Sequence, residues 1–244
     1  MCGTCFNFTA GYTRCWACAH GQPALDALAP ISYSVAREQL HHALASYKRL
    51  DGDVARRLQA ILAAILWRFL TDHEECVARA ATTRQFDLVT TVPSGDPTRD
   101  ERHPLPTIVG ELVGPTRDRH RRLLRRAKTQ MPPRTFSPAK FEATANLDHR
   151  SVLLIDDTWT TGASAQSAAA TLKAAGAEHV AAVVIGRYLT REWHENDRRL
   201  RGIARPFDWR ACALCAKPID LVDLTSPFRP TSTPRRPSPG LSDS

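Results

Sequence analysis

Residues 152 to 164 read Val152-Leu153-Leu154-Ile155-Asp156-Asp157-Thr158-Trp159-Thr160-Thr161-Gly162-Ala163-Ser164. The apolar run at the start predicts a buried strand of a parallel sheet, which delivers two carboxylates to its C-terminal end. A Thr-rich turn follows, and an Ala-rich helix is expected from Ala163 to Ala175, capped by Gly176. Ligands bind beyond the carboxyl ends of the strands in open parallel sheets, so this turn is the expected binding site.

The turn carries the groups that hold a phosphate. Backbone N–H groups at a helix start can cradle an anion together with side-chain hydroxyls, and Gly162 allows the backbone to approach closely. The adjacent carboxylates of Asp156 and Asp157 would repel each other if buried, whereas at a strand end they can face solvent, ribose hydroxyls or a magnesium-bound ligand. Helix capping accounts for one Ser or Thr but not for an acidic pair followed by several hydroxyls.

This stretch resembles the phosphoribosyl pyrophosphate (PRPP) signature of type I phosphoribosyltransferases, in which apolar residues precede an acidic pair and a Thr-Gly turn. The resemblance implies that Asp156 and Asp157 bind ribose and that magnesium bridges ribose and pyrophosphate. In that family, a nitrogen nucleophile displaces the pyrophosphate, and the resemblance implies the same reaction here. An acidic residue usually replaces Thr160 in enzymes that act on 6-oxopurines, which argues against that subclass. The resemblance also implies a loop for the 5-phosphate made of Thr158, Thr160, Thr161, Gly162, Ala163 and Ser164.

The flanking sequence predicts an α/β fold. Strands are expected at 86–92 and 180–185, and their alternation with helices favours a parallel sheet with right-handed crossovers. Residues 23–85 are expected to form a helical segment, because apolar residues between 53 and 79 recur at three- and four-residue steps. The phosphoribosyltransferase-like domain is expected over 86–225. The tail 226–244 is rich in Pro, Ser and Arg and is expected to be disordered.

Six of the seven cysteines fall in Cys-x-x-Cys pairs. Two pairs, Cys2 with Cys5 and Cys15 with Cys18, predict a structural zinc knuckle over residues 1–22 with four thiolate ligands. The third pair, Cys212 and Cys215, could replace one N-terminal pair, bind a second metal with other ligands, or act as a redox pair. Cys76 is expected to be a core or surface thiol on the long helix.

The wider layout resembles the ComF family of competence-associated proteins, which join a Cys-rich zinc module to a phosphoribosyltransferase-like domain. The resemblance spans roughly residues 1 to 190. In an active member, the turn at Ser94 and Gly95 would hold pyrophosphate, but the sequence after Pro93 departs from the family's Arg-Gly-Phe-Asn-Gln-like segment. The resemblance rests on the Cys pairs, Tyr47-Lys48, Phe86-Asp87 leading to Val92-Pro93, the stretch Leu124 to Gln130, and the PRPP loop.

The chain is basic, with a net charge of +8, which suits a polyanionic partner such as nucleic acid or a phosphorylated small molecule. Positive charge is densest from Arg117 to Lys128, where the family has a mobile hood. Arg126 and Lys128 are therefore candidates for closing over pyrophosphate. A nucleic-acid phosphate clamp and a solvated helix face are the alternatives for this segment.

The start of the chain lacks a basic and then apolar secretory pattern. The longest mostly apolar stretch, 58–70, is too short for a membrane span and contains Arg68. We therefore expect a soluble, cytoplasmic protein with no membrane partner. Two functions follow from the sequence: a PRPP- and magnesium-dependent phosphoribosyltransferase, or a non-catalytic competence-type factor that uses the same fold for binding or regulation.

Overall fold

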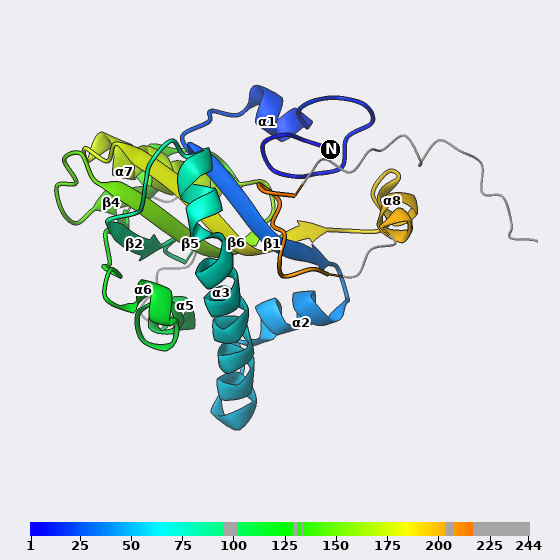
Figure 1. Ribbon diagram of the computed structural model, residues 1–244, viewed down its shortest axis with the longest axis horizontal. Coiled ribbons are helices and arrows are strands. Elements are labelled where there is room, and N and C mark those ends of the chain that lie inside the picture. The colour runs from blue at the N-terminus through cyan, green and yellow to red at the C-terminus, as the bar shows by residue number, and fades with distance from the viewer. Residues whose placement is uncertain (95–101, 129–130, 133, 204–206, 217–244) are drawn as a thin grey trace, which may run out of the picture.

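A four-stranded parallel sheet forms the centre of the protein (Figure 1). In this computed structural model, residues 1–94, 102–128, 131–132, 134–203 and 207–216 are described. The strand order is β1-β6-β5-β2. The sheet comprises β1 (Ala27–Val35), β2 (Leu88–Thr91), β5 (Ser151–Trp159) and β6 (His179–Leu189).

Helices cover both faces of the sheet, as the nearly continuous apolar sequences of β5 and β6 require. Successive side chains of a strand point to opposite faces. Leu153 and Ile155 therefore pack in one core with the long helix α3 (Gly52–Ala80), and Val152 and Leu154 pack in the other with α7 (Ala163–Ala174). The expected α/β class with a parallel sheet is confirmed.

The expected amphipathic helix is α3, and its apolar stripe is only partly covered. Leu62, Leu66 and Phe69 are buried against the sheet. Val54 and Ile61 lie on the same helix and are 56% and 52% exposed. The N-terminal half of α3 thus leaves part of its apolar surface toward solvent.

The expectation that residues 23–85 are helical is wrong for 27–35. These residues form β1, which pairs in parallel with β6, from Ala27 opposite Ala181 to Val35 opposite Leu189. Pro30 cannot donate a ladder hydrogen bond, but β1 is an edge strand, where proline is tolerated. Helix α2 (Gln39–Ser46) then leads to α3.

The basic run from Arg117 to Lys128 does not form the single helix that was considered for it. After β2 the chain forms three short turns, α5 (Pro104–Thr107), the π-helical η1 (Ile108–Leu112) and α6 (Gly114–Arg117). It then runs extended into β3 (Leu124–Arg126), which pairs antiparallel with β4 (Phe141–Ala143) after η2 (Pro138–Lys140).

Two short helices complete the elements, α1 (Trp16–His20) in the N-terminal Cys-rich segment and α8 (Asn196–Gly202) after β6. The expected tail 226–244 lies outside the described residues. Among the described helices, none combines the length and apolar character needed to cross a bilayer.

Candidate functional site

The strand that carries the acidic pair is longer than expected. Pairing with β6 continues past Asp156, which lies opposite Val184, to Trp159, which lies opposite Arg187. The strand does not end at Ile155 because β6 itself extends to Leu189 and supplies partners. Asp156 and Asp157 therefore belong to the last residues of β5, and their side chains leave opposite faces of the sheet.

Asp157 is held inside the protein. Its carboxylate accepts a 2.6 Å hydrogen bond from the hydroxyl of Tyr47 and forms an ion pair with Lys48. Only 4% of Asp157 and 1% of Tyr47 is exposed. Burial and then the Asp157 charge raise the pKa of Tyr47 well above its ordinary value, so the phenol stays protonated and donates. Sequence analysis noted Tyr47 and Lys48 but gave them no role.

Asp156 has a different environment. It is half-buried on the face that carries α7, and its Oδ1 accepts a 2.9 Å hydrogen bond from the backbone N–H of Asp157. Burial, followed by the neighbouring Asp157 carboxylate, raises the pKa of Asp156 to about 8. Lys48 acts in the opposite direction. A cation or a further hydrogen-bond donor near this carboxyl would lower its pKa and favour the charged form.

The turn after β5 requires glycine at position 162. Gly162 has φ +83°, in the left-handed region, and a Cβ there would overlap the ring of Trp159. This conformation starts α7 at Ala163, whose N–H donates to Oγ1 of Thr161 at 3.4 Å. The side chains of Thr160, Thr161 and Ser164 are exposed around the helix start. The turn thus presents hydroxyls beside N–H groups that have no intrahelical partner.

A cavity of about 240 Å³ adjoins the turn. Thr161, Gly162 and Ala163 form one wall, and the N-terminal Cys-rich segment forms another. Arg134 and His20 also line it, so two groups that can carry positive charge share the cavity with the loop. Arg134 could not be predicted as a site residue, because it lies in an irregular Pro-containing segment far from the loop in sequence.

A buried arginine connects the loop to the Cys-rich segment. Arg187 is 5% exposed, and its Nε donates to the carbonyl oxygen of Cys5 at 2.9 Å. Its Nη1 lies 3.3 Å from the carbonyl oxygen of Trp159 and 3.2 Å from that of Thr160. Arg187 thus fixes the loop backbone against the first Cys pair. This role was not predictable from the sequence, because it depends on the strand pairing that brings position 187 beside position 159.

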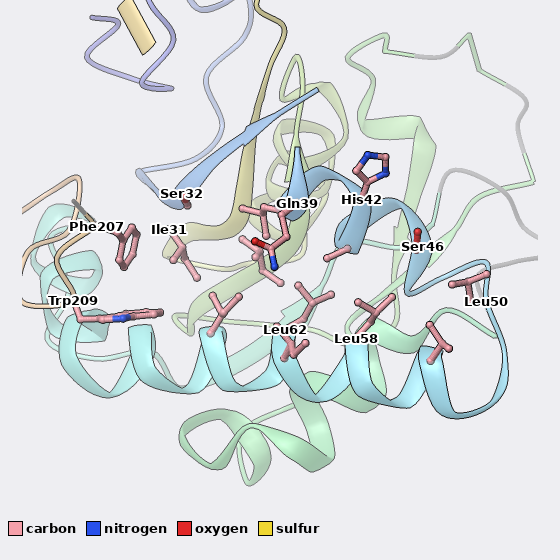
Figure 2. Close-up of a pocket in the computed structure, with 16 residues that line it drawn as sticks. Ile31, Ser32, Gln39, His42, Ser46, Leu50, Leu58, Leu62, Phe207 and Trp209 are labelled. Atoms are coloured by element: carbon pink, nitrogen blue, oxygen red, sulfur yellow. The ribbon is translucent and has the colours of Figure 1, made fainter. Parts of the chain in front are cut away.

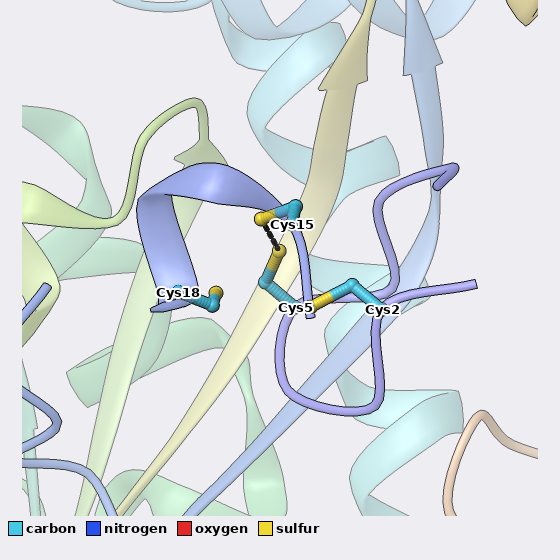
Figure 3. Close-up of side chains that lie close together, drawn as sticks. All are labelled: Cys2, Cys5, Cys15 and Cys18. Atoms are coloured by element: carbon cyan, nitrogen blue, oxygen red, sulfur yellow. Dashed lines mark hydrogen bonds between the residues drawn. The ribbon is translucent and has the colours of Figure 1, made fainter. Parts of the chain in front are cut away.

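The N-terminal cysteines meet as expected. Figure 3 shows Cys2 and Cys5 on one loop facing Cys15 and Cys18 at α1, with Cys5 and Cys15 joined by a dashed line. The Sγ atoms of Cys5 and Cys15 are 3.6 Å apart, and all four sulfur atoms lie within 4.8 Å of one another. A hydrogen bond from Cys18 and the charge of Arg187 lower the pKa of the Cys5 thiol to about 5. This group can hold a metal ion.

The third Cys pair does not join this cluster. Cys212 and Cys215 lie beside His73 and Cys76 of α3, and these four residues form a second group that could hold a metal ion. Cys76, expected from the sequence to be a core or surface thiol, thus lies among three other potential metal ligands. Its neighbour His73 was assigned no ligand role from the sequence.

The remaining predicted residues either do not line the cavity beside the loop or lie outside the described chain. Ser94 is half-buried just after β2, and Gly95 is not among the described residues. Arg126 is half-buried on β3 and Lys128 is exposed, and neither lines the cavity beside the loop. Burial and the charge of Arg126 lower the pKa of Lys140.

Part of the basic run is used within the protein. Arg119 forms two hydrogen bonds with the carboxylate of Glu74, at 2.6 and 2.8 Å, and Arg125 pairs with Glu142. These arginines have intramolecular partners, which weakens the interpretation of the run as a nucleic-acid clamp.

No family model matches the chain, and no curated protein matches it.

Proposed function

We propose that this protein binds PRPP and transfers its phosphoribosyl group to a nitrogenous acceptor with release of pyrophosphate. One observation carries the proposal. The exposed hydroxyls of Thr160, Thr161 and Ser164 surround the start of α7, and Arg134 lies across a cavity from this turn. Thr161 and Arg134 line the same cavity, so a neutral and a cationic donor are both available to a phosphate monoester there.

The 5-phosphate would lie at the turn. A Cβ at position 162 would overlap the Trp159 ring, so Gly162 lets the turn pack against that ring while holding the left-handed backbone. The volume of about 240 Å³ is below the 300–1,000 Å³ typical of drug-sized pockets, which suits a phosphate or a phosphosugar end rather than a large ligand.

The acidic pair would divide its roles. Asp156 leaves the strand on the α7 face, the face of the phosphate turn, and is the group we assign to the ribose hydroxyls. Asp157 is engaged with Tyr47 and Lys48 and positions the strand end. The family resemblance implies ribose contacts for both residues, and the buried setting of Asp157 favours Asp156 as the direct contact.

Magnesium would enter with the substrate. The described residues near Asp156 offer no compact set of carboxylates for a protein-built magnesium site, and the ion is commonly held through phosphates and water. Bound in this way, the ion would supply charge neutralisation for the leaving pyrophosphate. The chain's own contribution is to orient the ribose phosphate, since phosphate and ribose contacts at fixed positions align the anomeric carbon with an acceptor.

The N-terminal cluster fits a structural zinc ion. Its donors are four sulfur atoms, and the 3.6 Å between Cys5 and Cys15 is close to the edge of about 3.8 Å expected for a tetrahedral zinc–thiolate site. A closed set of four thiolates leaves no open position for chemistry. Zinc would fix the loop that carries Cys5, and through Arg187 it would stabilise the phosphate turn.

A second function is favoured by one feature. Asp157 is neutralised inside the protein by Lys48 and Tyr47, so only one carboxylate of the pair is directed at a ligand. A competence-type factor that binds PRPP as a regulatory ligand, without transfer, needs no second ribose contact. In that case PRPP binds but no acceptor is consumed.

Phosphorus NMR tests transfer directly. The zinc-loaded protein is mixed with magnesium, PRPP and a panel of purine and pyrimidine bases, and free pyrophosphate is followed over time. We expect acceptor-dependent release that falls in Thr161→Val and is retained in the matched control Thr107→Val, an exposed threonine on α5. Binding without release for every base would support the regulatory function instead, and absence of binding would reject both.

A further inference from the structure

Four metal-binding side chains meet where the C-terminal described segment packs on α3. His73 and Cys76 lie one helical turn apart on α3, and Cys212 and Cys215 follow more than a hundred residues later. One donor atom from each residue lies within 4.8 Å of all the others. The Sγ atoms of Cys76 and Cys215 are each 3.8 Å from Nδ1 of His73. The edges of a tetrahedral site with zinc–sulfur and zinc–nitrogen bonds are about 3.5–3.8 Å.

The second nitrogen of His73 indicates which atom faces the thiols as a ligand. Nε2 lies 2.8 Å from the carbonyl oxygen of Trp209, and a carbonyl can only accept. The proton of the neutral ring therefore lies on Nε2, and Nδ1 presents a lone pair to the thiols. A histidine ligand whose other nitrogen donates to a backbone carbonyl is the usual arrangement at zinc sites. His73 is 4% exposed, so its ring orientation is fixed by packing.

The local backbone also suits thiolate ligands. The N–H of Cys212 donates to Sγ of Cys215 at 3.1 Å, and the N–H of Leu214 donates to Sγ of Cys212 at 3.4 Å. Hydrogen bonds of this kind favour the charged form of sulfur. The Cys-x-x-Cys turn is thus shaped to direct two sulfur atoms to one point.

The distribution of the seven cysteines also supports a second metal site. The chain has seven cysteines, of which four belong to the N-terminal group and the other three, Cys76, Cys212 and Cys215, belong to this one. Each group contains four donors in total, and no cysteine is left over. A redox pair of Cys212 and Cys215 would leave Cys76 and the lone pair of His73 unexplained.

We propose that His73, Cys76, Cys212 and Cys215 bind a second structural zinc ion, independent of the PRPP site, that fastens residues 207–216 to α3. This segment carries Phe207 and Trp209, which form one end of an apolar cavity of about 700 Å³ (Figure 2). The other walls come from α2, α3 and the sheet, including Leu58 and Ile31. The zinc ion therefore sets the position of the aromatic end wall.

Metal analysis of the full chain by inductively coupled plasma mass spectrometry tests this site. We expect about two zinc ions per chain in the wild type and about one in Cys212→Ser/Cys215→Ser. Cys2→Ser/Cys5→Ser should also retain about one, and the control His149→Gln, at an exposed histidine, should retain about two. A wild type that binds only one ion, or a Cys212→Ser/Cys215→Ser variant that keeps both, would overturn the proposal.

Alkylation of the wild-type protein tests the same site without cysteine variants, which could fail to fold. Peptide mapping follows the modification of Cys76, Cys212 and Cys215 in zinc-loaded protein, before and after a chelator. We expect the three thiols to be protected together and to become reactive together when zinc is removed. A Cys212–Cys215 disulfide in the zinc-loaded protein, or alkylation rates that do not respond to the chelator, would contradict the second site.

Discussion

Nε of Arg187 donates a hydrogen bond to the carbonyl oxygen of Cys5 across 2.9 Å. The same guanidinium reaches the backbone of Thr160 in the turn after β5. One buried side chain therefore joins the Cys-rich segment to the turn that we assign to phosphate. Under our proposal, a metal ion at the N-terminal cysteines would act on the turn through this side chain.

Removing the Arg187 side chain should destabilise both the Cys-rich segment and the turn after β5. Arg187→Met leaves the carbonyl oxygens of Cys5 and Thr160 without their donor, at a cost of about 1–3 kcal/mol for each buried group. We expect the midpoint of urea unfolding to fall and the thiols of the N-terminal cluster to react faster with an alkylating agent. Arg198→Met, at an arginine whose side chain is 72% exposed, is the control and should change neither measurement.

Gly162 tests the shape of the turn. Gly162→Ala adds a methyl group that overlaps the Trp159 ring at a residue with φ +83°. Gly52→Ala is the matched control, because Gly52 has φ +70° but nothing within 4 Å of the added Cβ. The control should lose about 1–2 kcal/mol of unfolding free energy from backbone strain alone. We expect a larger loss for Gly162→Ala together with loss of PRPP binding, and equal losses would show that the close approach to Trp159 is unimportant.

Tyr47 should stabilise the protein through Asp157. Tyr47→Phe removes the 2.6 Å hydrogen bond and leaves a buried carboxylate with fewer donors, so the free energy of unfolding should fall by about 1.5–3 kcal/mol. Tyr12→Phe, at a tyrosine that is 72% exposed, should have almost no effect in the same urea titration. A Tyr47→Phe protein as stable as the control would mean that Lys48 alone satisfies Asp157.

The raised pKa of Asp156 predicts how stability depends on pH. The folded pKa is about 8, whereas an unfolded aspartate titrates near 4, so the folded state holds a proton that the unfolded state releases. The stability from this group is fully present below about pH 4 and is lost as the pH rises through about 8. Urea midpoints of the wild type should fall across this window more steeply than those of Asp156→Asn. Parallel pH profiles for the two proteins would contradict the assignment.

Strands with an unbroken apolar sequence could be predicted. Strand segments that form only because a neighbouring strand supplies backbone hydrogen bonds could not. Ile155 was expected to end its strand because two charged residues follow it, yet β6 provides backbone partners as far as Trp159. Residues 27–35 were included in the expected helical segment because of the periodicity at 53–79, and Pro30 obscures a strand that forms only at a sheet edge. Local patterns report burial well, but pairing is a property of the whole sheet.

The two candidate metal-binding groups also differ in how far they could be predicted from the sequence. The N-terminal group was readable because its two pairs lie close in sequence. The second group joins Cys76 to Cys215 only after the chain folds back onto α3. The available signal was the odd seventh cysteine, which lies three residues after a histidine on a helix and so on the same face.

Calorimetric titration with magnesium and PRPP tests the central claim most directly. The zinc-loaded wild type should bind one PRPP with saturation. Asp156→Asn should bind at least about tenfold more weakly, a loss of about 1.4 kcal/mol. Asp51→Asn, which removes one exposed carboxylate at the start of α3, should bind like the wild type. A folded, zinc-loaded wild type that binds no PRPP, or an Asp156→Asn variant that binds as tightly, would contradict the account.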